Sequence, residues 1–438
     1  MQADKTTLND LAIFAHNEEN SILHHIDFTG TAGGREWLRL LLSKPLKGIK
    51  EITNTQRLIK RIISKHEQWP KNITNGTIMV LERFYDSPID EMPHHANAVN
   101  AATYKVLHGP DYALVRYSVQ HFTEFVKGLN MLVQVLQDEN NPPNLKLLTD
   151  RISMMLNKPE IADVLNTTDP KAISQQDVLQ RGFFFRRKFK EDCFELIDTY
   201  NQLDAYYSMA KACINYGYVF PLMQETDDAA LSATQLWHPL LRTPVAYDVA
   251  LEKSQNFLFL TGANMAGKST FIKAVGLAVY MAHIGMGVPA KEFALSCFDG
   301  LLSNIQVEDN IIQGESYFFN EVQRIRKTIE KISDGKKWLI LIDELFKGTN
   351  VQDAMKCSTV VIEGLLKMKN VLFILSTHLY EIGDGLKKYP NIQFRYFETE
   401  VSNDQLLFSY QLKDGISNDR LGYLILKREG VVDMLEKL

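Results

Sequence analysis

Residues 262–270 read Gly-Ala-Asn-Met-Ala-Gly-Lys-Ser-Thr, which fits the phosphate-loop pattern GxxxxGK[ST]. An apolar run at residues 257–260 precedes this segment, and a helical pattern follows from Phe271. Between a strand and a helix, such a loop points successive backbone N–H groups at an anion, and its glycines let phosphate oxygens approach closely. We expect Lys268 to neutralise the β- and γ-phosphates of a nucleotide and the Ser269 hydroxyl to ligate Mg²⁺.

Two carboxylates, Asp343 and Glu344, directly follow a second apolar run at residues 338–342. Open α/β sheets bind their ligands at the carboxyl ends of such strands. Asp343 is expected to hold Mg²⁺, directly or through water, opposite Ser269. Glu344 is then positioned to polarise the water that attacks the γ-phosphate. An acidic pair alone is often only a solvated loop, but behind a phosphate loop it indicates a nucleotide hydrolase.

Two weaker signals extend this site. His378 lies two residues beyond the apolar run 371–376, where ABC-type ATPases have a histidine that senses the γ-phosphate, although a histidine at a strand end is more often structural. Ser316 lies in the segment 314–321, at a loop-to-helix boundary, where it could cap the helix. In ABC-type ATPases a segment in this place contacts the γ-phosphate of the opposite subunit.

The elements that must position these residues differ between the two halves of the chain. Residues 1–230 are predicted to form a mostly α-helical core or lever domain, because apolar residues recur at spacings of three and four. Residues 231–438 are predicted to form an α/β P-loop ATPase domain of ABC type, because short apolar strands alternate with helical segments. A late pair of runs, 393–398 and 406–412, predicts a hairpin at the sheet edge.

The composition excludes several classes of protein. Hydrophobic content of 45% and charged content of 23% are typical of a soluble globular protein, and the net charge of −5 gives no whole-chain argument for nucleic-acid binding. The four cysteines are scattered without a CxxC pair, which suits a reducing cytoplasm. The N-terminus lacks the apolar core of a signal peptide, and the most apolar long stretch is too short to span a bilayer. A cytoplasmic location without a membrane is therefore expected.

A basic and aromatic cluster in the first half leaves two interpretations open. Interleaved charges and rings of this kind could bind nucleic acid. They also suit a helix that buries its apolar residues and solvates its charges. The cluster consists of Arg181, Phe183, Phe184, Phe185, Arg186, Arg187, Lys188, Phe189 and Lys190.

Taken together, these motifs resemble those of the MutS family of DNA mismatch-repair ATPases. Residues 261–270 look like that family's extended loop TGPNMGGKST, and residues 343–350 are similar to its DE-I-x-R-G-T segment. Residues 237–239, Trp-His-Pro, resemble the RHP that opens the family's ATPase domain, and Asp414-Gly415 with Gly422 resembles its late DG…G element. Residues 10–31 and 42–46 look like the start of its helical core.

The resemblance implies a cytoplasmic homodimer with two composite ATP and Mg²⁺ sites and helical levers that reach toward DNA. Ser316 would then contact the nucleotide of the opposite subunit, and Asn264 would add a side-chain hydrogen bond to the phosphates. The residues expected to bind nucleotide are Gly262, Ala263, Asn264, Met265, Ala266, Gly267, Lys268, Ser269, Thr270 and Ser316.

The departures from the family pattern qualify this expectation. Ala263 and Ala266 replace a proline and a glycine but keep the GxxxxGK skeleton, and Tyr317 and Phe319 replace a threonine and a methionine. The chain starts at the helical core, and the family's mismatch-reading domain has no counterpart in it. Direct reading of a mismatch by base-stack insertion is therefore not expected.

We accordingly expect a MutS-like ATPase that controls binding to mismatched or otherwise non-standard DNA, with a repair or recombination protein as a possible partner. The alternative is a nucleotide-switched module that binds a protein and does not act on DNA. A transporter cassette is disfavoured by the long helical half and the lack of a membrane segment. A kinase is disfavoured because Glu344 suits water activation.

Overall fold

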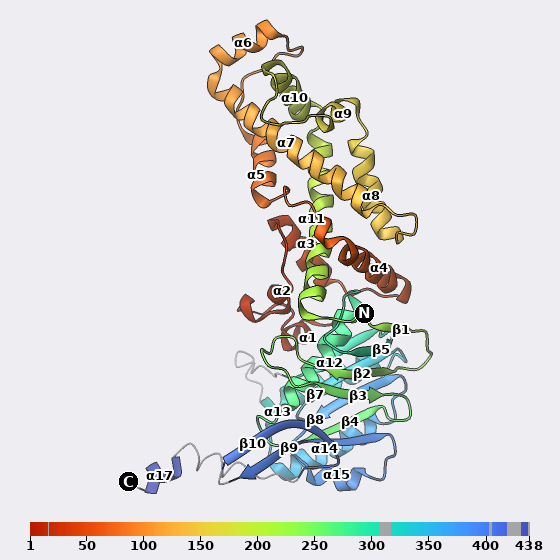
Figure 1. Ribbon diagram of the computed structural model, residues 1–438. Helices are drawn as coiled ribbons and strands as arrows, with labels where there is room; N and C mark the ends of the chain where they lie inside the picture. The colour runs from red at the N-terminus through yellow and green to blue at the C-terminus, as the bar shows by residue number, and fades with distance from the viewer. Residues whose placement is uncertain (16, 306–316, 403–404, 418–430, 437–438) are drawn as a thin grey trace. The chain divides into compact units, whose positions relative to one another are not determined.

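The computed structural model describes the chain except for residues 16, 306–316, 403–404, 418–430 and 437–438 (Figure 1). Contacts divide the chain into two compact units, one of residues 1–25, 45–53 and 216–438 and one of residues 26–44 and 54–215. Residues 1–25 belong with the sheets because they bond to them: the backbone N–H of Ser303 donates to the Thr7 hydroxyl at 3.0 Å. The division into functional domains at residues 230 and 231 stays a prediction.

The second unit is built from helices, as the apolar spacing predicts. Its elements are α3 (Ala32–Ser43), the greater part of α4 (Ile49–Lys65), the short 3-10 turn η2 (His66–Gln68), α5 (Asn75–Asp86), α6 (Ala98–Leu107), α7 (Gly109–Leu136), α8 (Pro143–Leu156), α9 (Pro159–Leu165), α10 (Gln175–Arg187) and α11 (Lys190–Tyr216). Pro110 in the first turn of α7 suits a helix start, where its missing N–H would be unbonded anyway. The core of this unit includes the stacked rings of Phe122 and Phe185, with centroids 4.3 Å apart.

The packing of α3 against α11 depends on glycine and on one buried carboxylate. Asp204 in α11 accepts backbone N–H groups of Gly30 and Thr31, at 3.0 Å each, at the start of α3. A Cβ atom at Gly34 would lie 2.2 Å from an Asp204 oxygen, so a larger residue would displace the carboxylate from these hydrogen bonds. Burial raises the pKa of Asp204, and the hydrogen bonds counter that effect.

The described residues of the first unit form two sheets (Figure 1). The six-stranded sheet has the order β10-β9-β4-β8-β7-β6, and the four-stranded sheet has the order β1-β5-β2-β3. The strands are β1 (Leu222–Gln224), β2 (Leu231–Leu236), β3 (Tyr247–Leu251), β4 (Phe257–Thr261), β5 (Glu292–Ser296), β6 (Gly300–Asn304), β7 (Trp338–Asp343), β8 (Val371–Ser376), β9 (Ile392–Ser402) and β10 (Gln405–Asp414).

The six-stranded sheet confirms the strands and the edge hairpin expected from the sequence. Its strands β9, β4, β8, β7 and β6 run parallel, and β10 pairs antiparallel with β9 at the edge. The helices of this unit are α1 (Lys5–Asp10), the 3-10 turn η1 (Glu18–Asn20), α2 (Ile22–His25), α12 (Lys268–His283), α13 (Tyr317–Ile332), α14 (Val351–Leu365), α15 (Glu381–Leu386) and α17 (Val431–Glu436).

Helices cover both faces of this sheet. Alternate strand residues such as Phe259 and Ile340 form one buried cluster with Ile325 of α13 and Ile362 of α14. The intervening residues point to the other face, where Leu341 packs so tightly on α12 that a Cβ atom at Gly276 would lie 2.5 Å from it. Because both faces are buried, β4, β7 and β8 are apolar along almost their whole length. The sheet thereby holds the carboxyl ends of these strands in fixed positions.

His283, at the end of α12, makes the stability of this unit sensitive to acid. Its ring is fully buried, and its Nε2 accepts the backbone N–H of Phe298 at 2.9 Å, so Nδ1 carries the proton that is donated to the Val279 carbonyl. Burial lowers the pKa of His283 to about 4. The folded state therefore favours the neutral ring, and this contribution is present above the unfolded pKa of about 6.5 and lost as the pH falls toward 4.

We expect His283 alone to lower the free energy of unfolding by about 2 kcal/mol between pH 7 and pH 5. Urea unfolding at the two pH values, followed by tryptophan fluorescence, measures this change. His283→Gln keeps a donor and an acceptor but does not titrate, so it should show a flatter dependence on pH. Equal pH dependence in the wild type and in this variant would contradict the assignment.

Candidate active site

The loop of residues 262–267 joins the end of β4 to the start of α12, whose first turn carries Lys268, Ser269 and Thr270. Gly262 and Gly267 have φ values of +137° and +110°, a region that residues with a Cβ atom rarely adopt. A Cβ atom at Gly262 would also lie 3.0 Å from the Phe397 carbonyl oxygen of β9. The two glycines of the sequence pattern are therefore required by the backbone conformation of the loop.

Lys268 is the first residue of α12, and its side chain folds back over the loop. Its Nζ donates to the carbonyl oxygens of Gly262 and Ala263 at 2.8 and 2.9 Å. The side chain is only 6% exposed. Burial lowers the pKa of Lys268 to about 8, against the attraction of Asp343 and Glu344. An anion placed beside this ammonium group would favour its charged form.

Ser269 and Asp343 meet at the carboxyl end of the sheet. The Ser269 hydroxyl donates to Asp343 Oδ2 at 2.5 Å, and the Ser376 hydroxyl donates to Asp343 Oδ1. The register of the sheet explains the second contact, because Asp343 of β7 pairs with Ser376 of β8. The helix that follows the glycine loop and two neighbouring strands thus place three oxygen-bearing side chains together.

Glu344 lies between two nitrogen-bearing side chains. Its Oε1 is 3.0 Å from His378 Nε2, and its Oε2 is 2.7 Å from Lys347 Nζ. Burial and then the neighbouring Lys268 charge lower the pKa of His378, so a neutral ring donates its Nε2–H to Glu344. Lys268 Nζ lies at 3.4 Å from the same Nε2 and cannot donate to it while that nitrogen carries the proton.

These side chains face one pocket of about 530 Å³. Its wall contains all but three of the nucleotide and metal residues predicted from the sequence. The exceptions are Gly262 and Ala266, which shape the loop without lining the pocket, and Ser316, which lies outside the described residues. The lining residues are Leu241, Thr243, Val245, Tyr247, Ala263, Asn264, Met265, Gly267, Lys268, Ser269, Thr270, Asp343, Glu344, Lys347, His378 and Tyr410.

The chain is similar to known proteins over the region that contains this pocket. The family description MutS domain V matches residues 258–434, which include the glycine loop, both carboxylates and His378. MutS protein homolog 4 of Homo sapiens is 29% identical over 327 residues, which cover 70% of this chain and 34% of the human protein. The DNA mismatch repair protein MutS of Pseudothermotoga lettingae is 30% identical over 278 residues, covering 60% of this chain and 33% of that protein.

The chain belongs to the MutS family. A further relative, the DNA mismatch repair protein MSH3 of Candida glabrata, is 32% identical over 241 residues, covering 52% of this chain and 23% of that protein. The matched part is therefore about a third of the length of the first two relatives and less than a quarter of the third. Within the described residues, no helix has both the length and the apolar character needed to cross a membrane.

Several residues in or beside the pocket were not identified from the sequence, among them Lys347, Tyr247 and Tyr410 of its wall and Ser376, which contacts Asp343 without lining the pocket. Lys347 lies within the MutS-like segment 343–350, and its spacing of three from a predicted base is a usable signal for an ion pair. Ser376 ends an apolar strand, and its role becomes visible only through the register with β7. Tyr247 and Tyr410 come from β3 and β10, and no local pattern connects them.

The basic and aromatic cluster is largely part of the fold of the helical unit. Phe184, Phe185 and Phe189 are buried. Arg186 donates to the carbonyl oxygens of Phe84 and of Ser87, the latter at 2.6 Å. The structure thus favours the interpretation in which rings are buried, and it removes Arg186 from the free basic surface. Arg187, Lys188 and Lys190 remain exposed.

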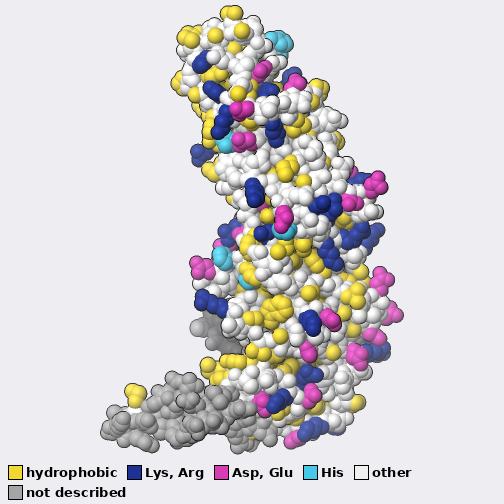
Figure 2. Space-filling view, in the orientation of Figure 1, with side chains coloured by type: hydrophobic (Ala, Val, Ile, Leu, Met, Phe, Trp, Pro, Cys, Tyr) yellow, Lys and Arg dark blue, Asp and Glu magenta, His cyan; other side chains and the backbone are white. Residues whose placement is uncertain are grey.

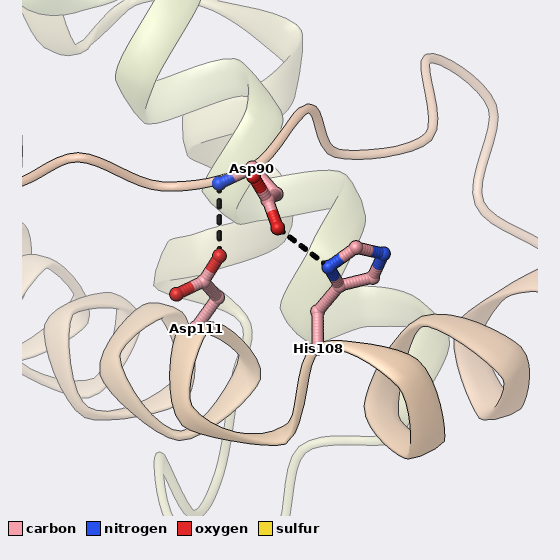
Figure 3. A group of neighbouring side chains, drawn as sticks. All are labelled: Asp90, His108 and Asp111. Carbon is pink, nitrogen blue, oxygen red and sulfur yellow. Dashed lines mark hydrogen bonds and ion pairs between the residues drawn. The ribbon is translucent and has the colours of Figure 1, made fainter.

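A second group of polar side chains, in the helical unit, contains potential metal ligands. His108 Nδ1 lies 2.7 Å from Asp90 Oδ2, and the backbone N–H of Asp90 donates to Asp111 Oδ2 at 2.8 Å. Figure 3 shows these three side chains and the two contacts. The Tyr104 hydroxyl also donates to the Asp90 carbonyl oxygen at 3.0 Å. These contacts bind the segment before α6 to the junction of α6 and α7. The group therefore has a structural role, which is to hold this segment against the two helices.

Proposed function

We propose that this chain binds ATP with Mg²⁺ in the pocket at the end of β4 and β7 and hydrolyses it to ADP and phosphate. One observation carries the proposal: Lys268, Ser269, Asp343, Glu344 and His378, which come from three separate stretches of sequence, converge on one pocket. MutS family members are ATPases, and the region matched by domain V contains all five residues.

The glycine loop and the start of α12 suit the triphosphate. Backbone N–H groups at a helix N-terminus bind anions, and this helix begins at Lys268. Its ammonium group is held over the loop by two carbonyl oxygens and would exchange these contacts for phosphate oxygens. Asn264 lines the same pocket and could donate a side-chain hydrogen bond to the phosphates.

The oxygen atoms of Ser269 and Asp343 fit a magnesium ion. They lie 2.5 Å apart, and hydroxyl and carboxylate oxygens are the ligands that Mg²⁺ prefers. Mg²⁺, when bound with the nucleotide, neutralises charge on the phosphate oxygens. Ser376 holds the second oxygen of Asp343 and so fixes the orientation of the carboxylate.

Glu344 is the proposed general base. It follows the metal-binding Asp343 directly, and its two oxygens are held by Lys347 and His378. It would orient the attacking water and take up its proton. The neutral ring of His378 has one N–H group, which it donates to Glu344 in the free pocket and would donate to the γ-phosphate once nucleotide is bound.

The remaining wall of the pocket suits the nucleobase. Tyr247 and Tyr410 line it together with Leu241 and Val245. Aromatic and aliphatic side chains bind a flat base by stacking and by burial of apolar surface. A pocket of about 530 Å³ is within the range of small-molecule sites.

For the whole protein we propose an ATP-controlled DNA-binding function in a homodimer, where Ser316 of one copy completes the site of the other. The support is the family membership and the names of relatives, two of which are called DNA mismatch repair proteins. The net charge of −5 favours the second candidate, a nucleotide-switched module whose partner is a protein. Figure 2 shows Lys and Arg side chains interspersed with Asp and Glu on the face drawn.

Fluorescence anisotropy with matched, mismatched and branched duplexes, at several salt concentrations, separates the two candidates. We expect weak, salt-sensitive binding with little preference for a mismatch, because backbone contacts carry no sequence information. The pair Arg187→Glu and Lys188→Glu should weaken binding to every duplex by a similar factor and flatten the salt dependence. A control pair of exposed lysines, Lys367→Glu and Lys369→Glu, should have a smaller effect. No binding at any salt concentration would favour the protein partner.

A further inference from the structure

The segment that carries the proposed base has an unusual backbone. Glu344 and Phe346 have φ values of +64° and +61°, although neither is glycine. Such conformations cost free energy and persist only where the surroundings impose them. The Glu344 N–H donates to the Ser376 carbonyl oxygen at 2.9 Å, which fixes the start of the segment. The remainder of the segment, up to Gly348, needs other contacts to hold its backbone in place.

Glu321 of α13 supplies that support. Its Oε1 accepts the backbone N–H of Lys347 at 3.0 Å, and its Oε2 accepts the N–H of Gly348 at 3.1 Å. The residue is only 5% exposed. Two successive N–H groups are thus bound by the two oxygens of one buried carboxylate, which is a strong and directional contact.

The helix that carries Glu321 is itself held firmly. Arg324, three residues later, donates to the Ser303 carbonyl oxygen at 3.2 Å, and the Asn304 side chain donates to the Thr328 hydroxyl at 3.3 Å. These contacts fasten α13 to the end of β6. The helix is therefore a fixed base from which Glu321 can hold the segment.

The position of this segment determines the surroundings of Glu344. Lys347, whose N–H is bound by Glu321, forms the 2.7 Å ion pair with Glu344 Oε2. If the segment moved, the base would lose this partner and its alignment with a water molecule. Small displacements of a reacting group can lower a rate by about 10²-fold.

We propose that Glu321 is a positioning residue for ATP hydrolysis. It does not itself line the pocket and acts by fixing the segment from Glu344 to Gly348. This inference rests on the proposed ATPase function. It predicts a lower kcat with little change in KM, because the phosphate loop and Lys268 are supported by other contacts.

The test compares Glu321→Ala, Glu321→Gln and Glu330→Ala with the wild type. We expect Glu321→Ala to lower kcat by roughly 10- to 100-fold while KM for ATP changes less than about threefold. Gln keeps one carbonyl acceptor and should restore part of the rate. Glu330 lies on the same helix but is exposed and paired only with Arg326 among the described contacts, so Glu330→Ala should behave as the wild type.

Two readouts separate positioning from general destabilisation. The backbone amides of Lys347 and Gly348 should exchange hydrogen faster in Glu321→Ala than in the wild type. The melting temperature of Glu321→Ala should stay close to that of Glu330→Ala. When Glu344→Gln is also present, Glu321→Ala should cause little additional loss of rate, since both act on one step. If the wild type hydrolyses ATP and Glu321→Ala shows either the wild-type kcat or the wild-type rate of amide exchange, this inference alone is overturned. If the wild type does not hydrolyse ATP, the proposed function is overturned, and this inference with it.

Discussion

Glu344→Gln is expected to lower ATP turnover by roughly 10²-fold or more, the usual scale for losing a positioned base. The amide has almost the shape of the carboxylate but cannot accept the proton of the attacking water. ATP binding should persist, because the phosphate loop is unchanged. Phosphate release under saturating ATP, with an equilibrium binding measurement on the same preparation, checks both parts.

Glu363→Gln is a suitable control for this variant. Glu363 lies on α14 and pairs with Lys388 at 3.1 Å, and it does not line the pocket. It should retain the turnover of the wild type. Unchanged hydrolysis in Glu344→Gln would remove Glu344 from the role of base.

Lys268→Ala is expected to weaken ATP binding by roughly 10²-fold or more, as is usual when one partner of a buried charge pair is removed. The loop would also lose the contacts of Nζ with the Gly262 and Ala263 carbonyl oxygens. Isothermal titration with a non-hydrolysable ATP analogue and Mg²⁺ measures the change. Lys273→Ala, further along α12 and outside the pocket, should bind as the wild type does.

The affinity of the wild-type protein for ATP should depend on pH as expected from the titration of Lys268. Its pKa is about 8 in the free pocket, and the phosphates would raise it. Binding then takes up a proton at alkaline pH, so affinity is full below pH 8 and should fall by about tenfold by pH 9. Lys268 would be excluded from phosphate binding if the ATP affinity of the wild type did not change with pH over this range. The same would follow if Lys268→Ala bound ATP as tightly as the wild type.

The parts of the site that could be predicted from the sequence are those determined within one short segment. The φ values of Gly262 and Gly267 follow from a local pattern, and the position of Asp343 follows from an apolar strand whose carboxyl end meets a ligand. The same reasoning identified five of the six strands of the six-stranded sheet, including its edge hairpin, but not β6. In each case nearby residues, rather than distant contacts, decide the outcome.

What the sequence could not show depends on register and on contacts between distant segments. Ser376 reaches Asp343 only because β7 and β8 pair in a particular register. Glu321 reaches the segment after β7 across 26 residues of chain. The basic cluster carried two interpretations for the same reason, since the contacts of Arg186 with Phe84 and Ser87 join residues that are about a hundred positions apart.

A single-turnover experiment shows whether the pocket around Lys268 and Glu344 hydrolyses ATP. Protein in excess over radiolabelled ATP is mixed with Mg²⁺, and samples are quenched over time and analysed for ADP. We expect the wild type to convert the bound ATP to ADP and phosphate, and Glu344→Gln to hold the ATP intact over the same period. Bound ATP that remains intact on the wild type for as long as on Glu344→Gln would contradict this expectation.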